Sequence, residues 1–239
     1  MEYQERTYRN SVSKENLVSF QVKVGETDLY ISAEEDLTEI TLESVYKYRR
    51  LIEEYIKYRP QFLSSLVPIE PDKMAPAIIR DMLRASGTAG VGPMASVAGA
   101  IAQYVGLDLL KYSDNIIVEN GGDIFLKSER ETNVGIFAGE SPLSYKVALR
   151  IRSEDIPLGI CTSSGTVGHS LSLGKADAVC VTSKSASLAD AAATSIGNRV
   201  NGEGDIKAAI KTGADIEGIL GILIIVGDKM GAYGAIELV

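Results

Sequence analysis

The chain has 239 residues, 45% of them hydrophobic and 23% charged, a composition that fits a globular protein and excludes a disordered, collagen-like or coiled-coil chain. Its formal net charge of −8 argues against nonspecific binding to nucleic acid or to an anionic membrane, since both need clustered Lys and Arg. The first ten residues lack the apolar run of a secretory signal, and the most apolar stretch, Ile216 to Val226, is about half as long as a membrane span. We therefore expect a cytoplasmic protein that does not enter the membrane.

The first part of the chain predicts a hairpin followed by two helices. Leu17 to Val24 and Leu29 to Ala33 are rich in β-branched and aromatic residues and flank a turn, so they predict paired strands. Apolar residues recur at helical spacing from Thr38 to Tyr58, and Arg59-Pro60 follows as a stop. A second helix is predicted from Pro76 to Ser86, with Gly87 as its C-terminal cap.

A segment of small residues, Gly87 to Gly106, comes next. It predicts a glycine-rich loop through Gly92 and then a helix that begins at Pro93 and runs to about Tyr104. The exposed N–H groups at the start of such a helix favour an anion, for example a pyrophosphate. The same small side chains also allow close helix packing, and the sequence leaves both interpretations open.

The remainder of the chain predicts a sheet with two further helices. Because strands and helices do not alternate regularly, we expect an α+β fold with a mixed, largely antiparallel sheet. We expect one domain over residues 1–239, with room for two interleaved lobes. The predicted helices are Ser187 to Ile196 and Asp205 to Lys211, and the predicted strands are Ile116 to Glu119, Ile124 to Lys127, Asn133 to Ala138, Tyr145 to Ile151, Leu158 to Thr162, Ala178 to Thr182, Ile222 to Val226 and Ala232 to Val239.

A carboxylate and a hydroxyl share one face of the predicted helix from Ser187 to Ile196. Asp190 and Thr194 are four residues apart, so both side chains project in one direction. Both are hard oxygen ligands of the kind that Mg²⁺ takes beside a nucleotide phosphate. The alternative is that Asp190 interacts with the positive end of the helix and Thr194 bonds back to the preceding turn.

The single histidine lies in a loop rich in Ser and Gly. His169 in such a loop is a candidate general base or acid, and the neighbouring Thr162, Ser163, Ser164 and Ser170 are candidate ligands of phosphate oxygens. The alternative is a solvated loop histidine without a chemical role. Three serines and many aspartates leave any Ser-His-Asp constellation undetermined.

Four separated patterns, taken in order, resemble the ApbE-like superfamily, whose characterised members are FAD:protein FMN transferases. Ala98 to Gln103 is similar to the family's GGIAKG helix, and Val118 to Asp123 (VENGGD) is similar to VNxGGD. Gly159 to Gly165 (GICTSSG) is similar to G[IV]ATSG, and Leu188 to Thr194 (LADAAAT) is similar to ADALAT. The match covers the C-terminal two-thirds. The short chain and Glu26 to Leu29 (ETDL) resemble a small uncharacterised branch found in archaea and anaerobic bacteria.

The resemblance implies an ApbE-like, T-fold-like architecture with FAD or a related dinucleotide and Mg²⁺ near the LADAAAT helix. It implies transfer of FMN from FAD to a Thr or Ser of an acceptor protein, with His169 or an Asp as base. By resemblance, the metal ligands are Asp190, Thr194 and the carbonyl of Ala98, the catalytic candidates are His169 and Asp177, and the cofactor-binding residues are Gly99, Ala100, Gly121, Gly122, Asp123, Thr162, Ser163, Ser164 and Gly165.

The chain departs from the family at two places. His169 is not followed by the family's Asp-Pro pair, which leaves Asp177 as a loose substitute, and Gln103 stands where the family has a lysine. These departures favour flavin binding over FMN transfer. A second hypothesis is an accessory protein for sulfur incorporation in homocysteine biosynthesis, in which Cys161 would matter. A third is a ligand-binding module, and a homo-oligomer is compatible with all three.

Overall fold

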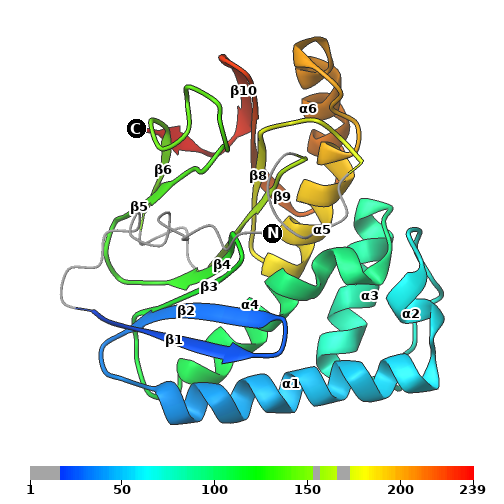
Figure 1. Ribbon diagram of the computed structural model, residues 1–239, viewed down its shortest axis with the longest axis vertical. Coiled ribbons are helices and arrows are strands. Elements are labelled where there is room, and N and C mark those ends of the chain that lie inside the picture. The colour runs from blue at the N-terminus through cyan, green and yellow to red at the C-terminus, as the bar shows by residue number, and fades with distance from the viewer. Residues whose placement is uncertain (1–16, 153–156, 166–172) are drawn as a thin grey trace.

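The computed structural model describes residues 17–152, 157–165 and 173–239, which form three layers. An eight-stranded sheet lies in the middle, and a three-stranded sheet lies on one of its sides. Figure 1 shows the helices gathered on the other side, with α1 running beneath β1 and β2 and α5 lying between α4 and α6. This arrangement buries both faces of the inner strands of the large sheet, which is why most of their residues are apolar on both sides, whereas the edge strand β1 alternates and the edge strand β10 is mostly exposed.

Every strand pair among the described residues is antiparallel, which confirms the predicted α+β fold class. The strand order is β1-β2-β3-β4-β7-β8-β9-β10 in the large sheet and β11-β6-β5 in the small one. The strands are β1 Val18–Val24, β2 Thr27–Ala33, β3 Ile116–Asn120, β4 Asp123–Lys127, β5 Thr132–Gly135, β6 Ala148–Ile151, β7 Leu158–Ser163, β8 Ala178–Ser183, β9 Ile219–Val226, β10 Lys229–Gly234 and β11 Glu237–Leu238.

The helices pack on the large sheet through small and branched apolar side chains. No helix of the described residues is long and apolar enough to cross a membrane. The helices are α1 Thr38–Tyr58, α2 Gln61–Ser64, α3 Ala77–Ala89, α4 Val97–Leu109, α5 Ala186–Gly197 and α6 Ile206–Ala214, with 3₁₀ turns at Pro93–Ser96 (η2) and Glu203–Asp205 (η4).

Two hydrophobic clusters fill the spaces between the layers. The larger one joins the helices to one face of the large sheet and includes Val118, Phe125 and Cys161. The smaller one fills the space between the two sheets and includes Ile124 and Ile160. Consecutive strand residues therefore point into different clusters, as the two-residue period of a strand requires.

The glycine-rich segment is more helical than the sequence predicts. The helix predicted to end at Ser86 continues to Ala89, and the left-handed cap is Gly90, with φ of 74°, rather than Gly87. The following helix begins as a 3₁₀ turn at Pro93 and extends as α4 to Leu109, past the predicted end. Tertiary packing overrides the low helix propensity of glycine here, because the small residues let α3, α4 and α5 approach closely.

Other boundaries also differ from the prediction. The strand predicted from Ala232 to Val239 is divided between β10 and β11, which belong to different sheets. A left-handed residue, Gly234 with φ of 83°, stands where the chain leaves the large sheet. The strands predicted from Asn133 and from Tyr145 are shorter than expected, and the four-residue helix α2 has no counterpart in the prediction.

Candidate functional site

The VENGGD motif forms a tight hairpin turn between β3 and β4. Gly121 and Gly122 have φ of 69° and 108°, values that L side chains rarely adopt, so the motif needs glycine at both positions. The N–H of Gly122 donates to Oε1 of Glu119 at 3.0 Å, and its carbonyl accepts from the N–H of Thr162 at 3.3 Å. The turn is thus fixed against the end of β7.

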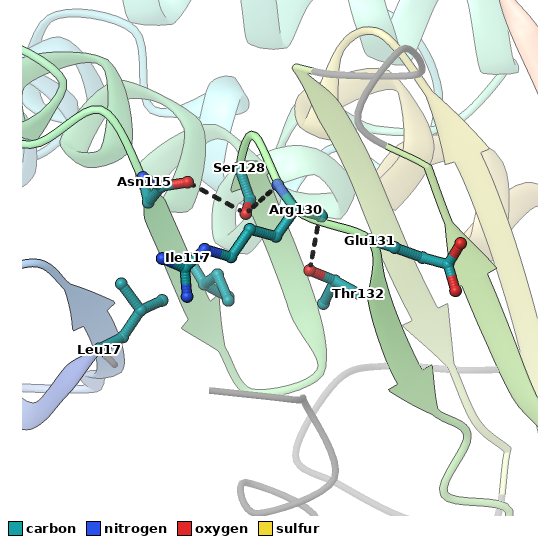
Figure 2. A pocket seen from close by; sticks show the side chains of 7 residues that line it. All are labelled: Leu17, Asn115, Ile117, Ser128, Arg130, Glu131 and Thr132. Carbon is teal, nitrogen blue, oxygen red and sulfur yellow. Dashed lines mark hydrogen bonds between the residues drawn. The ribbon is translucent and has the colours of Figure 1, made fainter. Parts of the chain in front are cut away.

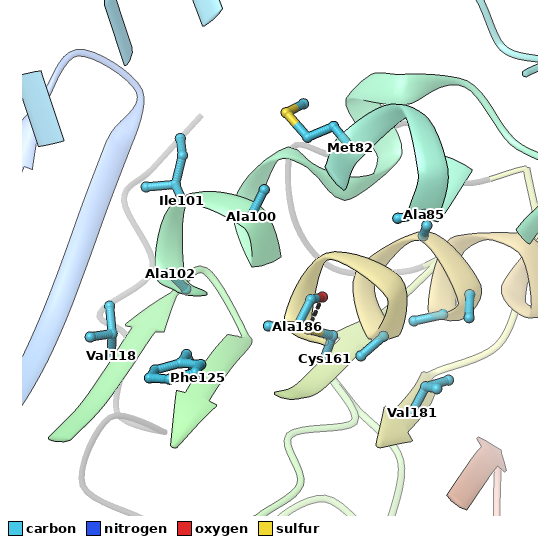
Figure 3. Packing of buried hydrophobic residues seen from close by; sticks show 14 of the residues in the cluster. Met82, Ala85, Ala100, Ile101, Ala102, Val118, Phe125, Cys161, Val181 and Ala186 are labelled. Carbon is cyan, nitrogen blue, oxygen red and sulfur yellow. Dashed lines mark hydrogen bonds between the residues drawn. The ribbon is translucent and has the colours of Figure 1, made fainter. Parts of the chain in front are cut away.

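Asp123 points from this turn toward the helices. It is paired with Cys161 across β4 and β7, so both side chains lie on the same face of the sheet. Figure 3 shows Cys161 beneath the start of α5, where its Sγ donates to the carbonyl of Ala186 at 3.3 Å. Only 9% of Asp123 is exposed.

Helices α4 and α5 satisfy each other's N-terminal amides. Oδ2 of Asp190, on α5, accepts from the N–H of Gly99, in the first turn of α4, at 2.9 Å. In return, Oε1 of Gln103, on α4, accepts from the N–H of Ala186, the first residue of α5, at 2.7 Å. These contacts fix the two helices to each other and fill positions that helix ends otherwise leave unpaired.

The close approach of the helices depends on glycine. A Cβ at Gly99 would lie 2.3 Å from the carbonyl oxygen of Ala186 and 2.9 Å from Cβ of Asp190. The hairpin turn joins the same place, since Nδ2 of Asn120 donates to the carbonyl of Ala98 at 3.1 Å. The structure therefore brings Ala98, Gly99 and Asp190 together with the turn that carries Asp123.

Both carboxyl groups of this site, those of Asp123 and Asp190, have pKa values above the ordinary value for aspartate. Burial, and then the negative charge of Asp190, raise the pKa of Asp123 well above its ordinary value. Burial also raises the pKa of Asp190, to about 7, although hydrogen bonds from the backbone amides of Gly99 and Ala98 oppose the rise. Within the described residues, no ion pair joins either carboxylate to Lys or Arg.

The donor set at this place fits a hard divalent cation. It consists of the Asp190 carboxylate, the Ala98 carbonyl and Thr194, which follows one turn later on α5, and Asp190 and Thr194 are both partly exposed. Oxygen donors of this kind suit Mg²⁺, and a cation would relieve the repulsion between the two neighbouring carboxylates of Asp123 and Asp190. The described residues contain no group of three or more His, Cys, Asp or Glu side chains arranged for a metal, so a site here relies on the hydroxyl and the carbonyl.

The predicted phosphate ligands of the TSSG segment do not all lie near Asp190. Thr162 pairs with Cys180, which belongs to the cluster between the sheets, so its side chain faces away from the helices. Ser163 points toward α5, where its Oγ would lie 3.7 Å from a Cβ at Gly197. Ser164 is partly exposed and Gly165 is exposed at the end of β7.

The remaining predicted residues are placed as follows. Ala100 is fully buried in the helix layer, so the structure does not expose this predicted cofactor-binding residue to a ligand. Oδ2 of Asp177 accepts from the N–H of Gly227 at 2.7 Å and thereby fixes the β9–β10 turn, rather than meeting Asp123 and Asp190. His169 and Ser170 lie outside the described residues.

Neither cysteine is placed for thiol chemistry. Cys161 and Cys180 are both free and buried. Burial, and then the charge of Asp123, raise the pKa of the Cys161 thiol well above its ordinary value, and burial raises the pKa of Cys180 to about 12. A thiol with a raised pKa and no access to solvent is a poor nucleophile, so the structure offers no reactive thiol for sulfur transfer.

Two concavities of the described surface lie away from this site. A cavity of about 100 Å³ at the opposite ends of β3 and β4 is lined by Asn115, Ile117 and Arg130, among others (Figure 2). A shallow groove of about 670 Å³ lies between α6 and β10. Neither concavity is lined by Asp123 or Asp190. The candidate site is therefore located by the positions of these two side chains and not by either concavity.

Two contacts at this site have no counterpart among the residues that the sequence predicts for it. Gln103, a departure from the family's lysine, accepts from the first amide of α5. Asn120, inside VENGGD, links the turn to α4 through its side-chain amide. A polar side chain between buried strand residues and two glycines is the signal that could have drawn attention to Asn120.

Comparison with known proteins identifies the relatives of this chain. A sequence model of the family described as "AbpE bacteria" matches residues 9–230. The chain is 42% identical over 226 residues to a UPF0280 protein of Methanococcus aeolicus, covering 92% of this chain and 91% of that protein. It is 47% identical over 193 residues to a UPF0280 protein of Methanothermobacter thermautotrophicus, covering 79% and 75%. The predicted resemblance to a small archaeal branch is thereby confirmed.

Solved structures show the same fold at low sequence identity. The flavin transferase ApbE from Vibrio cholerae matches with a TM-score of 0.58 and 15% identity, over 92% of this chain and 97% of that one. The ApbE protein from Thermotoga maritima matches with a TM-score of 0.58 and 11% identity, over 90% and 96%. The predicted ApbE-like architecture is thus confirmed.

Proposed function

We propose that this chain, which belongs to the ApbE-like family described as "AbpE bacteria", binds a flavin nucleotide, FAD or a related dinucleotide, where α4, α5 and the β3–β4 turn meet. The observation that carries the proposal is the position of Asp190, whose carboxylate accepts from the N–H of Gly99 at the N-terminus of α4, where Asn120 also ties the β3–β4 turn to the Ala98 carbonyl. Hard oxygen donors beside a helix N-terminus suit a magnesium–phosphate group. Flavin transferases that share the fold support flavin as the ligand class.

In this proposal Asp190, Thr194 and the Ala98 carbonyl hold Mg²⁺. When bound, the ion supplies positive charge that offsets the negative charge of phosphate oxygens. Gln103 and Gly99 do not contact the ion in this proposal. Their hydrogen bonds fix α5 against α4 and so fix Asp190 relative to Ala98. Asn120 holds the Ala98 carbonyl through its amide, which orients that oxygen.

The reaction proposed for the site is transfer of FMN to a protein hydroxyl. The oxygen of an acceptor Thr or Ser forms a bond to the FMN phosphorus, the bond from that phosphorus to AMP breaks, and AMP leaves with the electron pair. The hydroxyl proton passes to a base, for which His169 is the candidate that the sequence offers. Positioning and charge compensation supply most of the rate in such a reaction.

The test separates binding from transfer. FAD fluorescence is titrated with the protein in the presence of Mg²⁺ or of EDTA, and AMP release and covalent flavin are then measured with acceptor domains that carry an exposed Thr or Ser. Asp190→Asn and Thr194→Val should each weaken Mg²⁺-dependent FAD binding at least tenfold. Asp215→Asn, which changes an exposed carboxylate after the end of α6, should leave it unchanged and serves as the matched control.

The outcomes discriminate between the hypotheses. Mg²⁺-dependent FAD binding with AMP release supports the transferase. Binding without AMP release with any acceptor supports a ligand-binding module that does not transfer FMN. Binding that is absent, or equal in wild type and Asp190→Asn, overturns the proposed site.

A further inference from the structure

The two edge strands of the eight-stranded sheet, β1 and β10, differ in whether they carry features that prevent pairing with another chain. Strand β1, at one edge, places the polar side chains of Gln21 and Lys23 on its exposed positions. Strand β10, at the other edge, has no charged residue after Lys229, and most of its residues are exposed. Native proteins usually protect a free edge with charges, proline or a bulge. An edge without such protection indicates a strand that is paired in the working protein.

The register of the β9–β10 hairpin shows which backbone groups of β10 are free. A two-residue turn, with Gly227 at φ of 59°, joins Val226 and Lys229, which pair directly. That pair is hydrogen-bonded in such a hairpin, so alternate residues along β10 direct their N–H and C=O groups away from β9. These include Met230 and Ala232, and no described residue pairs with them on that side.

A groove follows this edge on the helix side. It has a volume of about 670 Å³ between α6 and β10. Ile206 and Ile210 line it from α6, and Gly231 lines it from β10 without a side chain. A Cβ at Gly231 would lie 2.5 Å from Ile206, so α6 rests directly on this part of the strand. Tyr233, two residues further and on the same face, is 46% exposed.

From these features we propose that two copies of this chain pair through β10 to form a continuous sheet. An antiparallel two-fold arrangement places Ala232 opposite Ala232 of the second copy, and the two residues exchange two hydrogen bonds. The same register places Gly231 opposite Tyr233 of the second copy, in the pair type whose side chains lie closest. The exposed tyrosine of each copy then covers the glycine of the other and packs in the groove beside Ile210, an arrangement known to compensate glycine in strands.

The charge of the groove favours a second copy as the occupant. The chain carries a net charge of −8, which opposes self-association over most of its surface. The charged residues that line the groove are Glu203, Lys207 and Lys229, and Lys229 pairs with Asp228 at 3.2 Å, so the local charge is close to zero. Two acidic molecules can approach here with less repulsion than at other faces, and the small side chain of Ala232 lets the strands meet.

The test is the molar mass in solution, measured by light scattering on a gel-filtration column over a range of concentrations. Wild type should form a dimer of twice the 25.6 kDa chain mass. Ala232→Pro removes an N–H that points away from β9, so no hydrogen bond to β9 is lost. Tyr233→Ser removes the aromatic ring that each copy would place in the groove of the other. Each should raise the dissociation constant at least tenfold. Lys23→Pro removes an outward N–H at the β1 edge and should leave the dimer intact.

The result that overturns the proposal is a wild-type chain that stays monomeric at high micromolar concentration. A dimer whose mass is the same in folded Ala232→Pro and Tyr233→Ser also overturns it, because another surface then holds the copies together. Circular dichroism shows whether each variant folds, and Tyr233→Ser decides the matter where the proline variant does not fold. The outcome is independent of flavin binding.

Discussion

Replacing Asp190 by Asn tests the electrostatics of the candidate site most directly. The amide keeps the size of the side chain and an oxygen that can accept from the N–H of Gly99, but it removes the negative charge. Burial raises the pKa of Asp190 from an ordinary value of 3.8 to about 7. This difference corresponds to roughly 4 kcal/mol, since one pKa unit is about 1.4 kcal/mol. Partial exposure and the coupling to Asp123 reduce it, and we expect about 2 kcal/mol in practice.

The sign follows from linkage. A carboxyl whose pKa is raised by folding binds its proton more tightly in the folded state, so its stabilisation is fully present below the unfolded pKa. That stabilisation is lost as the pH rises from about 4 through about 7. At pH of about 8 the Asn variant should therefore be more stable than wild type by about 2 kcal/mol, or roughly 4–8 °C in Tm. At pH of about 4 the two proteins should be equally stable.

The assay is urea and thermal denaturation across this pH range, with and without millimolar Mg²⁺. If Asp190 holds the metal, Mg²⁺ should stabilise wild type at pH of about 8, should do so less at pH of about 5, and should have no effect on Asp190→Asn. Asp215→Asn is again the control. The reasoning is refuted if the Asn variant is less stable than wild type at the higher pH, or if Mg²⁺ stabilises both proteins equally.

Three further predictions concern the contacts around the site. Gly99→Ala should lower the free energy of unfolding by about 1–3 kcal/mol in urea denaturation, because its Cβ would meet the Ala186 carbonyl at 2.3 Å; an unchanged midpoint would contradict this packing. Gln103→Ala should cost about 1 kcal/mol in the same measurement, since the first amide of α5 loses its acceptor, and Gln103→Glu should recover most of it. Cys161 and Cys180 should resist Ellman's reagent until the protein is unfolded, and rapid labelling of the native protein would show an accessible thiol that the structure lacks.

Local signals account for most of what the sequence predicted correctly. The helix Thr38–Tyr58 has the bounds expected from its apolar period and its terminating proline, because both signals act within a few residues. The first hairpin likewise follows from strand propensity and turn residues. Where a boundary depended on packing between distant elements, as at Gly87 and Gly90, propensity gave the wrong residue.

The candidate site shows a similar division. The order of the motifs placed Ala98, Asp123 and Asp190 in one region by resemblance, and the structure brings them together. The hydrogen bond that gives Asp190 its position joins residues 91 apart in the sequence, and no local pattern reports such a contact. Asp190 does interact with the positive end of a helix, as the alternative interpretation held, but that helix is α4 rather than its own. Thr162 lies next to the other TSSG residues in the sequence but not near Asp190 in the structure. The pleat of β7 turns its side chain to the face of the sheet that lies away from the helices.

The departure at Gln103 changes what the site requires of a ligand. A lysine at this position would supply a cation near the phosphates of the proposed ligand, whereas the Gln103 side chain accepts from the α5 backbone and carries no charge. Asp123 and Asp190 add negative charge at the same place, and within the described residues neither forms an ion pair. A nucleotide phosphate brought to these carboxylates would be repelled unless a cation came with it or both carboxyls were protonated. Flavin binding at this site should therefore depend on a divalent cation more strictly than in a relative that keeps the lysine.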